Sequence, residues 1–430
     1  MSTTPPPILS ATGATPVQRA AAVQKRTMVV LVITQIVGTV GVGVAPSIGI
    51  LLAGEVTESE TWAGLARTAS TLGAALLGLP LGNLAARFGR RVALSTGWWL
   101  AGVGAAILVA AAQWNLVVPL FIGLLLIGSG SAVSLQSRFA ATDLAEPRHK
   151  ARSLSLIVWV GTLGSVLGPN LGAPGALLGA ATGLTVFASA FLIAAICLGL
   201  AGTIVFLVLR PDPLLLHNQI AHTATSAKPG RKRGSIRRIF GEIRVNRAAR
   251  TALIAILTAQ IVMVSIMTMT PVHIVHQGGS VNLVGITISL HILGMYALAP
   301  LVGWVTDRYG HRLAVWVGIV ILILSLIAGA LWPNDTGWII ASLILLGVGW
   351  SFVNVAGSAL FASTVSDEVR ASSQGGVDAL SNLFGATAAF AAGPLLAVSS
   401  FSMLSILAMV VLIPLILLVV RPLPLNRAAR

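Results

Sequence analysis

Residues 82–91 read GNLAARFGRR, and residues 303–312 read GWVTDRYGHR. Both segments begin with glycine, contain a second glycine near their end and finish with arginine, and both follow a long apolar stretch. Glycine at such positions permits a tight turn and the close approach of neighbouring helices. One copy lies in each half of the 430-residue chain, so the sequence predicts two halves with the same internal order.

The composition indicates a membrane protein. Hydrophobic residues make up 56% of the chain, charged residues 9%, and the mean hydropathy is +0.92, whereas a soluble domain carries about 25% charged residues. Residues 1–18 are polar and proline-rich and lack the apolar core of a signal peptide, so we expect no cleavage. The single cysteine, Cys197, excludes an intramolecular disulfide and a cysteine-cluster metal site.

Apolar stretches predict the number of membrane spans. A helix that crosses a bilayer needs about 20 mostly apolar residues. Twelve stretches meet this requirement, so we predict an all-α membrane protein with 12 transmembrane helices in two pseudo-symmetric halves of six. Their approximate ranges are 28–53, 62–83, 92–113, 116–139, 153–173, 184–209, 251–272, 281–303, 312–331, 337–361, 373–397 and 400–420.

Charged residues in the loops predict the orientation. The loops on the side of the N-terminus are rich in cations, namely Arg87, Arg90, Arg91, Arg148, Lys150, Arg152, Arg308, Arg312, Arg427 and Arg430. The opposite loops contain the acids Glu55, Glu58, Glu60 and Asp335 and almost no cations. Because cytoplasmic loops carry the excess of Lys and Arg, we expect a multi-pass protein of the cytoplasmic membrane with both termini in the cytoplasm.

The middle of the chain predicts a linker. Residues 210–250 contain ten Arg and Lys against two acids, Asp212 and Glu242. We interpret them as a basic cytoplasmic linker, topogenic or facing lipid, between an N-terminal half at 1–209 and a C-terminal half at 251–430. The linker explains much of the net charge of +15, so binding of nucleic acid is not expected.

The repeated loop and the two sets of six spans resemble the major facilitator superfamily over the whole chain. The resemblance implies a secondary transporter that works by alternating access, with the loop as a cytoplasmic latch. The matching residues are Gly82, Arg87, Gly89 and Arg90 in the first copy and Gly303, Asp307, Arg308, Gly310 and Arg312 in the second. Ala86 replaces the family's acid in the first copy, so this latch should be weaker or take its charge from elsewhere.

The fifth span contains GTLGSVLGPNLGAPG at 161–175, which is similar to the Gly–Pro motif of proton-driven antiporters in that superfamily. Its glycines recur every three or four residues and form a flat face for close packing. Pro169, which follows Gly168, adds a kink. We expect a helix-packing element that takes part in the rocking of the two halves.

Ionisable side chains within spans are costly and are therefore functional candidates. For coupling or gating we select Asp378, with Asn382 one turn later, together with Arg67, Arg138 and Asp143. Asp378 is the one candidate for a buried proton-binding carboxylate; a salt bridge or gate at the cytoplasmic helix ends is the alternative. The first span has no acid, and no arginine precedes GSGSA at 128–132, unlike in many drug/proton antiporters of that superfamily, which argues against a drug pump.

Methionine and histidine gather in the seventh and eighth spans. Met263 and Met267 are four residues apart, as are His291 and Met295, so each pair shares one helix face. His273 and His276 follow at the outer end of the seventh span, where they could capture an ion. Thioether and imidazole ligands suit Cu(I), although methionine is also common core filler.

The MxxxM and HxxxM pairs, with QSRFAATDLA and GPNLG, resemble the CcoA-like copper importers, a branch whose relatives also transport riboflavin. The resemblance implies copper uptake with Met263, Met267, His291 and Met295 as metal ligands, copper being the substrate and not a cofactor. Importers of this type also use cysteines, and this chain has only Cys197. Any thiol relay is then absent or replaced, for example by the two outer histidines.

The alternative function is transport of a small organic solute, either riboflavin-like uptake or proton-coupled drug efflux. Four tryptophans could then line a cavity and stack on a planar ring: Trp98, Trp99, Trp159 and Trp350. No nucleotide-binding loop or hydrolase motif is present, so an enzyme is not expected. We expect a monomer that contacts the lipid bilayer and its substrate.

Overall fold

The computed structural model describes residues 16–146, 149–224, 246–364 and 367–420, and this part of the chain is helical without strands. It contains 12 helices that are long and apolar enough to cross a membrane. The predicted all-α class with 12 spans is therefore confirmed. The basic linker predicted at 210–250 lies partly outside the described residues. Its first part contains a short helix, α9 (Pro213–Ala224), and the described chain resumes at residue 246.

The N-terminal half contains six spans, two of which are broken into shorter pieces. In chain order the elements are α1 (Pro16–Val42), η1 (Ala45–Gly49), α2 (Ile50–Thr57), α3 (Glu60–Phe88), α4 (Arg90–Trp114), α5 (Val117–Ala140), α6 (Lys150–Leu167), η3 (Gly168–Leu171), α7 (Gly172–Thr182) and α8 (Val186–Val208). The first span breaks at η1, which contains Pro46, and the fifth at η3, which contains Pro169. Proline lacks the N–H that a regular helix needs, which favours a break at both positions, although α3 and three helices of the C-terminal half each continue through a proline.

The C-terminal half repeats this order. Its elements are α11 (Arg247–His276), α12 (Val281–Tyr296), α13 (Ala299–Tyr309), α14 (His311–Leu331), α15 (Thr336–Thr364), α16 (Asp367–Val398) and α17 (Phe401–Val420). Here the eighth span is divided into α12 and α13, and Pro300 stands in the first turn of α13.

Each half has its own apolar core. In the N-terminal half the fully buried Trp98 lies so close to Gly38 that a β-carbon there would be 2.5 Å from the indole ring, so glycine is required. The core of the C-terminal half is joined by Ile50 and Leu51 from α2 of the other half. Each half is therefore packed around its own core, and residues of α2 also join the core of the other half.

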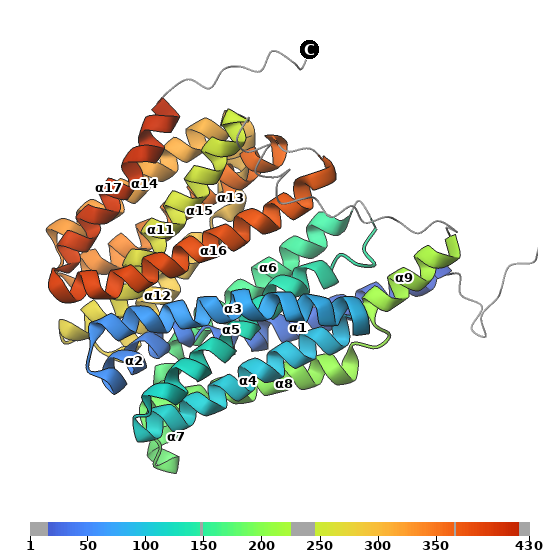
Figure 1. The fold of residues 1–430 in the computed structure, drawn as a ribbon, viewed down its shortest axis with the longest axis horizontal. Coiled ribbons are helices and arrows are strands. Elements are labelled where there is room, and N and C mark those ends of the chain that lie inside the picture. The colour runs from blue at the N-terminus through green and yellow to red at the C-terminus, as the bar shows by residue number, and fades with distance from the viewer. Residues whose placement is uncertain (1–15, 147–148, 225–245, 365–366, 421–430) are drawn as a thin grey trace, which may run out of the picture.

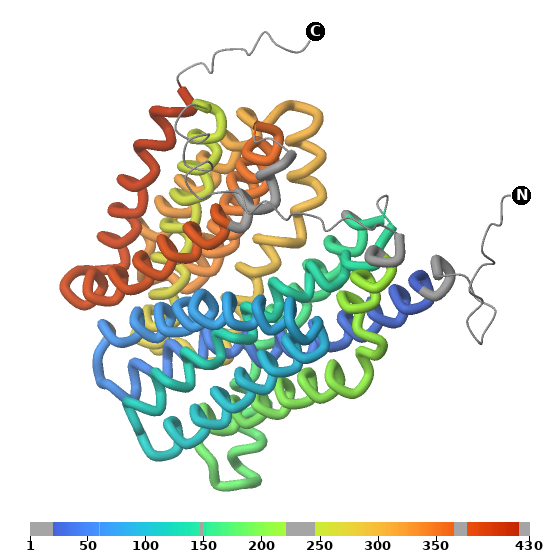
Figure 2. Tube along the Cα trace, turned by 45° about the vertical axis from the view of Figure 1, so that its right-hand side comes forward, coloured from blue at the N-terminus to red at the C-terminus, as the bar shows by residue number. Residues whose placement is uncertain are grey.

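The two halves meet near one end of the bundle and diverge toward the other (Figures 1 and 2). We call the diverging end, where α3 and α13 finish at Phe88 and Tyr309, the basic end, and the opposite end, which carries Glu55, the acidic end. Toward the acidic end, the Asn170 amide donates a hydrogen bond of 2.6 Å to Ser289 Oγ. This hydrogen bond holds η3 against α12 where the two halves meet.

Helices α3 and α16 form the second contact between the halves (Figure 1). The Thr68 hydroxyl of α3 donates to the carbonyl oxygen of Ala386 in α16 at 2.9 Å. One turn earlier, Gly64 lies against the same helix, where a β-carbon would be 2.4 Å from the Ala389 carbonyl oxygen. Only glycine permits this close approach of two long helices.

Candidate substrate cavity

A cavity of about 340 Å³ lies between the two halves. Helices α1, α3, α5 and α6 and the irregular element η1 form its N-terminal wall, and α11, α12 and α16 form its C-terminal wall. Two of the helix breaks described above border it, since Pro46 of η1 and Tyr296 at the end of α12 line it. Irregular backbone at membrane depth is tolerated where it lines such a cavity.

The N-terminal wall is rich in hydrogen-bonding groups. Its hydroxyl and amide side chains are Gln35, Thr39, Ser70, Ser131, Ser134, Thr162 and Ser165. Several of the hydroxyls donate to the carbonyl of their own helix, as Thr162 does to Val158 at 3.2 Å, which leaves their lone pairs free to accept. The Gln35 Oε1 atom is buried without a hydrogen-bond partner among the described residues. This wall can therefore bind the polar edge of a solute.

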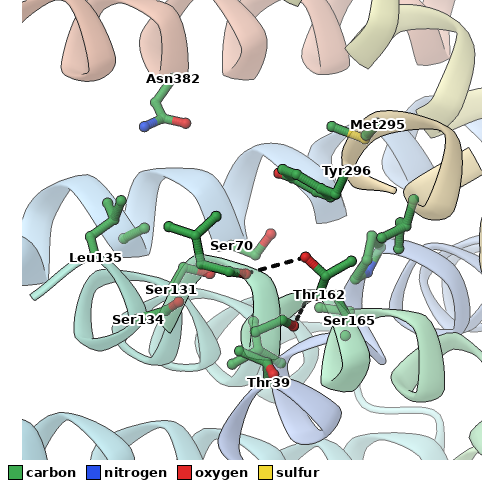
Figure 3. A pocket seen from close by; sticks show the side chains of 18 of the residues that line it. Thr39, Ser70, Ser131, Ser134, Leu135, Thr162, Ser165, Met295, Tyr296 and Asn382 are labelled. Atoms are coloured by element: carbon green, nitrogen blue, oxygen red, sulfur yellow. Dashed lines mark hydrogen bonds between the residues drawn. The ribbon is translucent and has the colours of Figure 1, made fainter. Parts of the chain in front are cut away.

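The C-terminal wall is mainly apolar. It consists of Met263, Met267, Ile292, Met295, Tyr296 and Asn382. Figure 3 shows Met295, Tyr296 and Asn382 on one side of the cavity and Ser131 and Thr162 on the other. Behind this wall Trp350 packs edge-on against Tyr296, with ring centroids 6.0 Å apart, and its indole N–H donates to Gln260 at 3.0 Å. The ring of Tyr296 is therefore held in place by Trp350, which is itself held by Gln260.

Two cations, Arg67 of α3 and Arg138 of α5, line the cavity, and none of its lining residues is an acid. The side chain of Arg67 makes no hydrogen bond or salt bridge to another described residue, whereas its backbone carbonyl accepts from the hydroxyls of Ser70 and Thr71 at 2.9 and 3.0 Å. The Arg138 Nε atom is buried without a hydrogen-bond partner among the described residues. Asp378 of α16, the carboxylate predicted from the sequence to be buried, is exposed and is not among the residues that line the cavity. The cavity consequently carries an excess of positive charge.

The methionines and histidines chosen from the sequence separate in space. Met263, Met267 and Met295 line the cavity, as their helical spacing predicts. His291 is fully buried beside α15, where its Nδ1–H donates to the Leu343 carbonyl at 2.7 Å. Its Nε2 atom has no hydrogen-bond partner among the described residues. The structure thus brings three thioethers together and leaves this imidazole in the helix packing behind them.

The two outer histidines lie at the acidic end. His273 Nε2–H donates to the Pro333 carbonyl at 2.6 Å, and its ring stacks on Phe401 with centroids 4.4 Å apart. His276 borders a second cavity of about 530 Å³, together with Glu55 and Glu58. Within the described ranges, no group of three or more His, Cys, Asp or Glu residues could hold a metal ion.

The first loop at the basic end contains a salt bridge. Arg90 Nε and Nη2 donate to the two carboxylate oxygens of Asp143 at 2.8 and 3.2 Å. Asp212 accepts from the Arg91 backbone N–H at 2.7 Å and lies against Gly89, whose φ of +90° favours glycine. Two acids from the segments that follow α5 and α8 therefore supply the negative charge that the sequence lacks at position 86.

The second copy of the loop has a different set of contacts. Gly310 also has a positive φ, +87°, and Arg312 donates to the carbonyls of Val419 and Val420 at 3.1 and 3.0 Å, at the end of α17. Arg308 lies over the ring of Trp304, and Asp307 is exposed. Arg87 of the first copy likewise lies 5.0 Å from the ring centroid of its neighbour Phe88. A β-carbon on Gly82 or Gly303 would meet open space.

The glycine–proline segment contacts both halves. A β-carbon on Gly168 would be 2.6 Å from Gly43 Cα, so η3 touches the first span directly. On the other side the Pro169 carbonyl oxygen would be 2.6 Å from a β-carbon on Gly285 of α12. This backbone-to-backbone packing places the motif at the contact between the halves.

The four tryptophans considered from the sequence are not among the residues that line the cavity. Trp98 is fully buried in the N-terminal core, Trp99 and Trp159 are 37% and 58% exposed, and Trp350 lies behind Tyr296. Sequence reasoning missed Tyr296 and the hydroxyl-bearing wall. The signal in the sequence was the helical spacing of polar residues in otherwise apolar spans. The pairs are Gln35 and Thr39, Ser131 and Ser134, and Thr162 and Ser165.

Comparison with known proteins agrees with this architecture. The family model described as Major Facilitator Superfamily matches residues 27–282 and 274–430. The chain is 35% identical over 383 residues to the uncharacterized MFS-type transporter YddS of Bacillus subtilis, covering 89% of this chain and 87% of that protein. It is 30% identical over 410 residues to the riboflavin transporter RfnT of Brucella anthropi, covering 91% of this chain and 96% of that protein.

Solved structures show the same fold at low sequence identity. A bacterial homologue of the human lysosomal transporter Spinster superimposes with a TM-score of 0.68 at 16% identity, covering 95% of this chain and 97% of that chain. The nucleoside transporter NupG gives a TM-score of 0.62 at 15% identity, covering 93% of this chain and 97% of that chain. The chain therefore belongs to the Major Facilitator Superfamily and is a membrane transporter, not an enzyme.

Proposed function

We propose that this transporter carries a small amphipathic organic solute through the central cavity by alternating access. The observation that supports this most directly is the contrast between the two walls, one rich in hydroxyls and cations and the other in thioether and aromatic groups. A cavity of about 340 Å³ lies within the range of roughly 300–1,000 Å³ that is usual for small-molecule sites. Both walls come from one chain, which is consistent with a monomer.

Riboflavin is the first solute to test. It combines a planar aromatic ring system, apolar at its dimethylbenzene end, with a polyhydroxyl side chain, which matches the two walls in chemical character. The relative RfnT is a riboflavin transporter and aligns along 91% of this chain. A flavin ring would pack against Tyr296 and the methionines, while its hydroxyls would bond to the serines and threonines of the other wall.

We further propose that the basic end faces the cytoplasm and that both termini lie on that side of the cytoplasmic membrane, because cations predominate in these loops. In the described conformation the halves are then in contact on the outer side, through Asn170 and Ser289, and apart on the cytoplasmic side. A rocking motion that breaks these contacts would expose the cavity to the other side of the membrane.

Uptake of riboflavin into proteoliposomes, followed by its fluorescence, tests the proposal. Thr162→Trp places a large ring in the cavity and should abolish uptake, because residue 162 lines it. Leu163→Trp is the matched control, because Leu163 is 41% exposed on the outside of the same helix, and it should retain uptake. Absence of riboflavin uptake by the folded native protein would refute a riboflavin-like function.

Copper uptake is the second candidate, favoured by the three thioethers that line one cavity, those of Met263, Met267 and Met295. Thioethers are ligands for Cu(I), and their replacement by leucine nearly conserves volume. The triple leucine variant should therefore lose copper accumulation if copper is the substrate and keep flavin uptake if an organic solute is. Copper accumulation that is the same with and without the native transporter would exclude this candidate.

A further inference from the structure

We propose that the transported solute carries an anionic group and that Arg67 binds this group in the central cavity. The inference rests on the proposed function, since it takes the cavity to be the solute site. It deepens that function by naming a charge on the solute, and it assigns its recognition to a side chain selected from the sequence for coupling or gating.

The first argument is the lack of a partner for Arg67. Its side chain is only partly exposed and makes no hydrogen bond or ion pair with the other residues that the structure describes. A guanidinium group has five N–H donors, and a cation within a membrane protein is usually paired or directed into a polar cavity. Arg67 therefore presents an unpaired charge to the space where the solute would lie.

Other arginines of the chain show what a structural role looks like. Arg90 is paired with both oxygens of Asp143, and Arg312 donates to two carbonyls at the end of α17. Both lie at the basic end, where water and lipid head groups would be available. Arg67 has neither kind of partner although it lies farther inside the helix bundle, so a purely structural role does not account for it.

The surroundings of Arg67 favour an anion over a neutral solute. No acid lines the cavity, and Arg138 adds a second positive charge. Helices α3 and α5 pack closely with Gly128 against Ser70, which places Arg67 deeper in the cavity than Arg138. An anion that enters from the basic end would therefore pass Arg138 first. Cations along such a path raise the local concentration of an anion.

Arg67 and Arg138 differ in where they lie along the cavity. Arg138 lies in the last turn of α5, at the basic end of the cavity. Arg67 lies farther from that end, on α3, and Tyr296, whose phenol is uncharged at neutral pH, lines the same cavity. The anionic group is therefore assigned to Arg67, the deeper of the two cations, and the phenol of Tyr296 is a hydroxyl donor in the same cavity.

A pair of flavins that differ by one phosphate tests the proposal. Binding of riboflavin and of flavin mononucleotide to the purified full-length transporter is measured by quenching of flavin fluorescence, for the native protein, Arg67→Gln and Arg67→Lys. We expect the native protein to bind the phosphorylated flavin at least tenfold more tightly, since hydrogen bonds to charged groups are the strong ones. Arg67→Gln should remove this preference, and Arg67→Lys should restore part of it. Arg26→Gln, at an exposed position of α1, is the control.

A second measurement does not depend on the choice of flavin. The cargo-free Arg67→Gln protein should unfold at a higher temperature than the native protein, because the variant removes an unpaired cation from the bundle. A structural role for Arg67 predicts the opposite, a lower unfolding temperature. Arg26→Gln should leave the unfolding temperature unchanged, since its side chain is exposed.

The outcomes separate the two proposals. Tighter binding of riboflavin than of its phosphate, or a preference that survives in Arg67→Gln, overturns the anion site and leaves a riboflavin-like function standing. If neither flavin binds, the riboflavin-like function fails, and the unfolding temperature decides the anion site. An increase in Arg67→Gln then supports it, and a decrease overturns it.

Discussion

The salt bridge between Arg90 and Asp143 offers a prediction whose size follows from the geometry. Both side chains are largely shielded, with 14% and 12% of their surface exposed, and two hydrogen bonds of 2.8 and 3.2 Å join them. An exposed pair would contribute about 0.2–1 kcal/mol, whereas hydrogen bonds to charged groups contribute about 1.5–3 kcal/mol. We expect Asp143→Asn to lower the free energy of unfolding by about 2 kcal/mol, a factor of about 30 in the equilibrium constant.

The assay is reversible unfolding of the purified transporter in mixed detergent micelles, carried out as a double-mutant cycle with Arg90→Gln. If the two residues stabilise the protein through each other, the double variant should be little less stable than either single variant. Glu55→Gln is the control, because Glu55 is exposed at the acidic end, and it should change the free energy of unfolding by less than about 0.5 kcal/mol.

The cycle can refute the reasoning. A coupling energy below about 0.5 kcal/mol would show that the two bonds do not stabilise the fold, and Asp143 would then not be the acid that replaces the one missing at Ala86. The prediction concerns folding and not transport direction, because Arg90 and Asp143 both belong to the N-terminal half.

Two further changes test the packing of the halves. Asn170→Ala removes the amide that donates to Ser289. The net loss of about 1 kcal/mol should shift the population roughly fivefold away from the conformation that is closed at the acidic end. The distance between spin labels placed at that end should therefore increase, and an unchanged distance would contradict this. Gly168→Ala places a β-carbon 2.6 Å from the Val40 carbonyl oxygen and should cost about 1–3 kcal/mol of stability in the same unfolding assay. Gly82→Ala is its matched control, because a β-carbon there meets open space; equal effects of the two alanines would show that helix contact is not what requires Gly168.

The architecture could be predicted from sequence because its determinants are local. Each span is a predominantly apolar segment, and a bilayer imposes a minimum length on every helix that crosses it. The loop repeat at 82–91 and 303–312 identified the two halves. Both loops turn at their second glycine, Gly89 and Gly310, with positive φ as a glycine position suggests.

The cavity could be predicted only in part, because it depends on which face of each helix turns inward. Met263 and Met267 face it as their spacing predicts, but the same argument does not distinguish a lining residue from a packing residue. His291 shows this difference, since it shares the four-residue spacing with Met295 and yet bonds to Leu343 behind the wall. The rotation of α12 against α15 decides between them, and that rotation is a tertiary property.

The acid that replaces the one missing at Ala86 shows the same limit. Asp143 follows α5, and Asp212 follows α8, so neither is near the loop in sequence. Both are brought there because α4 packs between α5 and α8. Sequence analysis could state that charge was required from elsewhere, but its source depended on helix neighbours.

The position of Arg67 in α3 connects solute binding to the contact between the halves. The next residue, Thr68, donates to the Ala386 carbonyl of α16, and Gly64, one turn earlier, touches Ala389 of the same helix. A bound anion would pull on the turn of α3 that also carries these contacts, since a helix turn moves as one unit. A solute can shift the equilibrium between two conformations only by binding them with different affinity. On the proposed mechanism, Arg67 supplies that difference because its position relative to α16 must change when the contact at Thr68 opens.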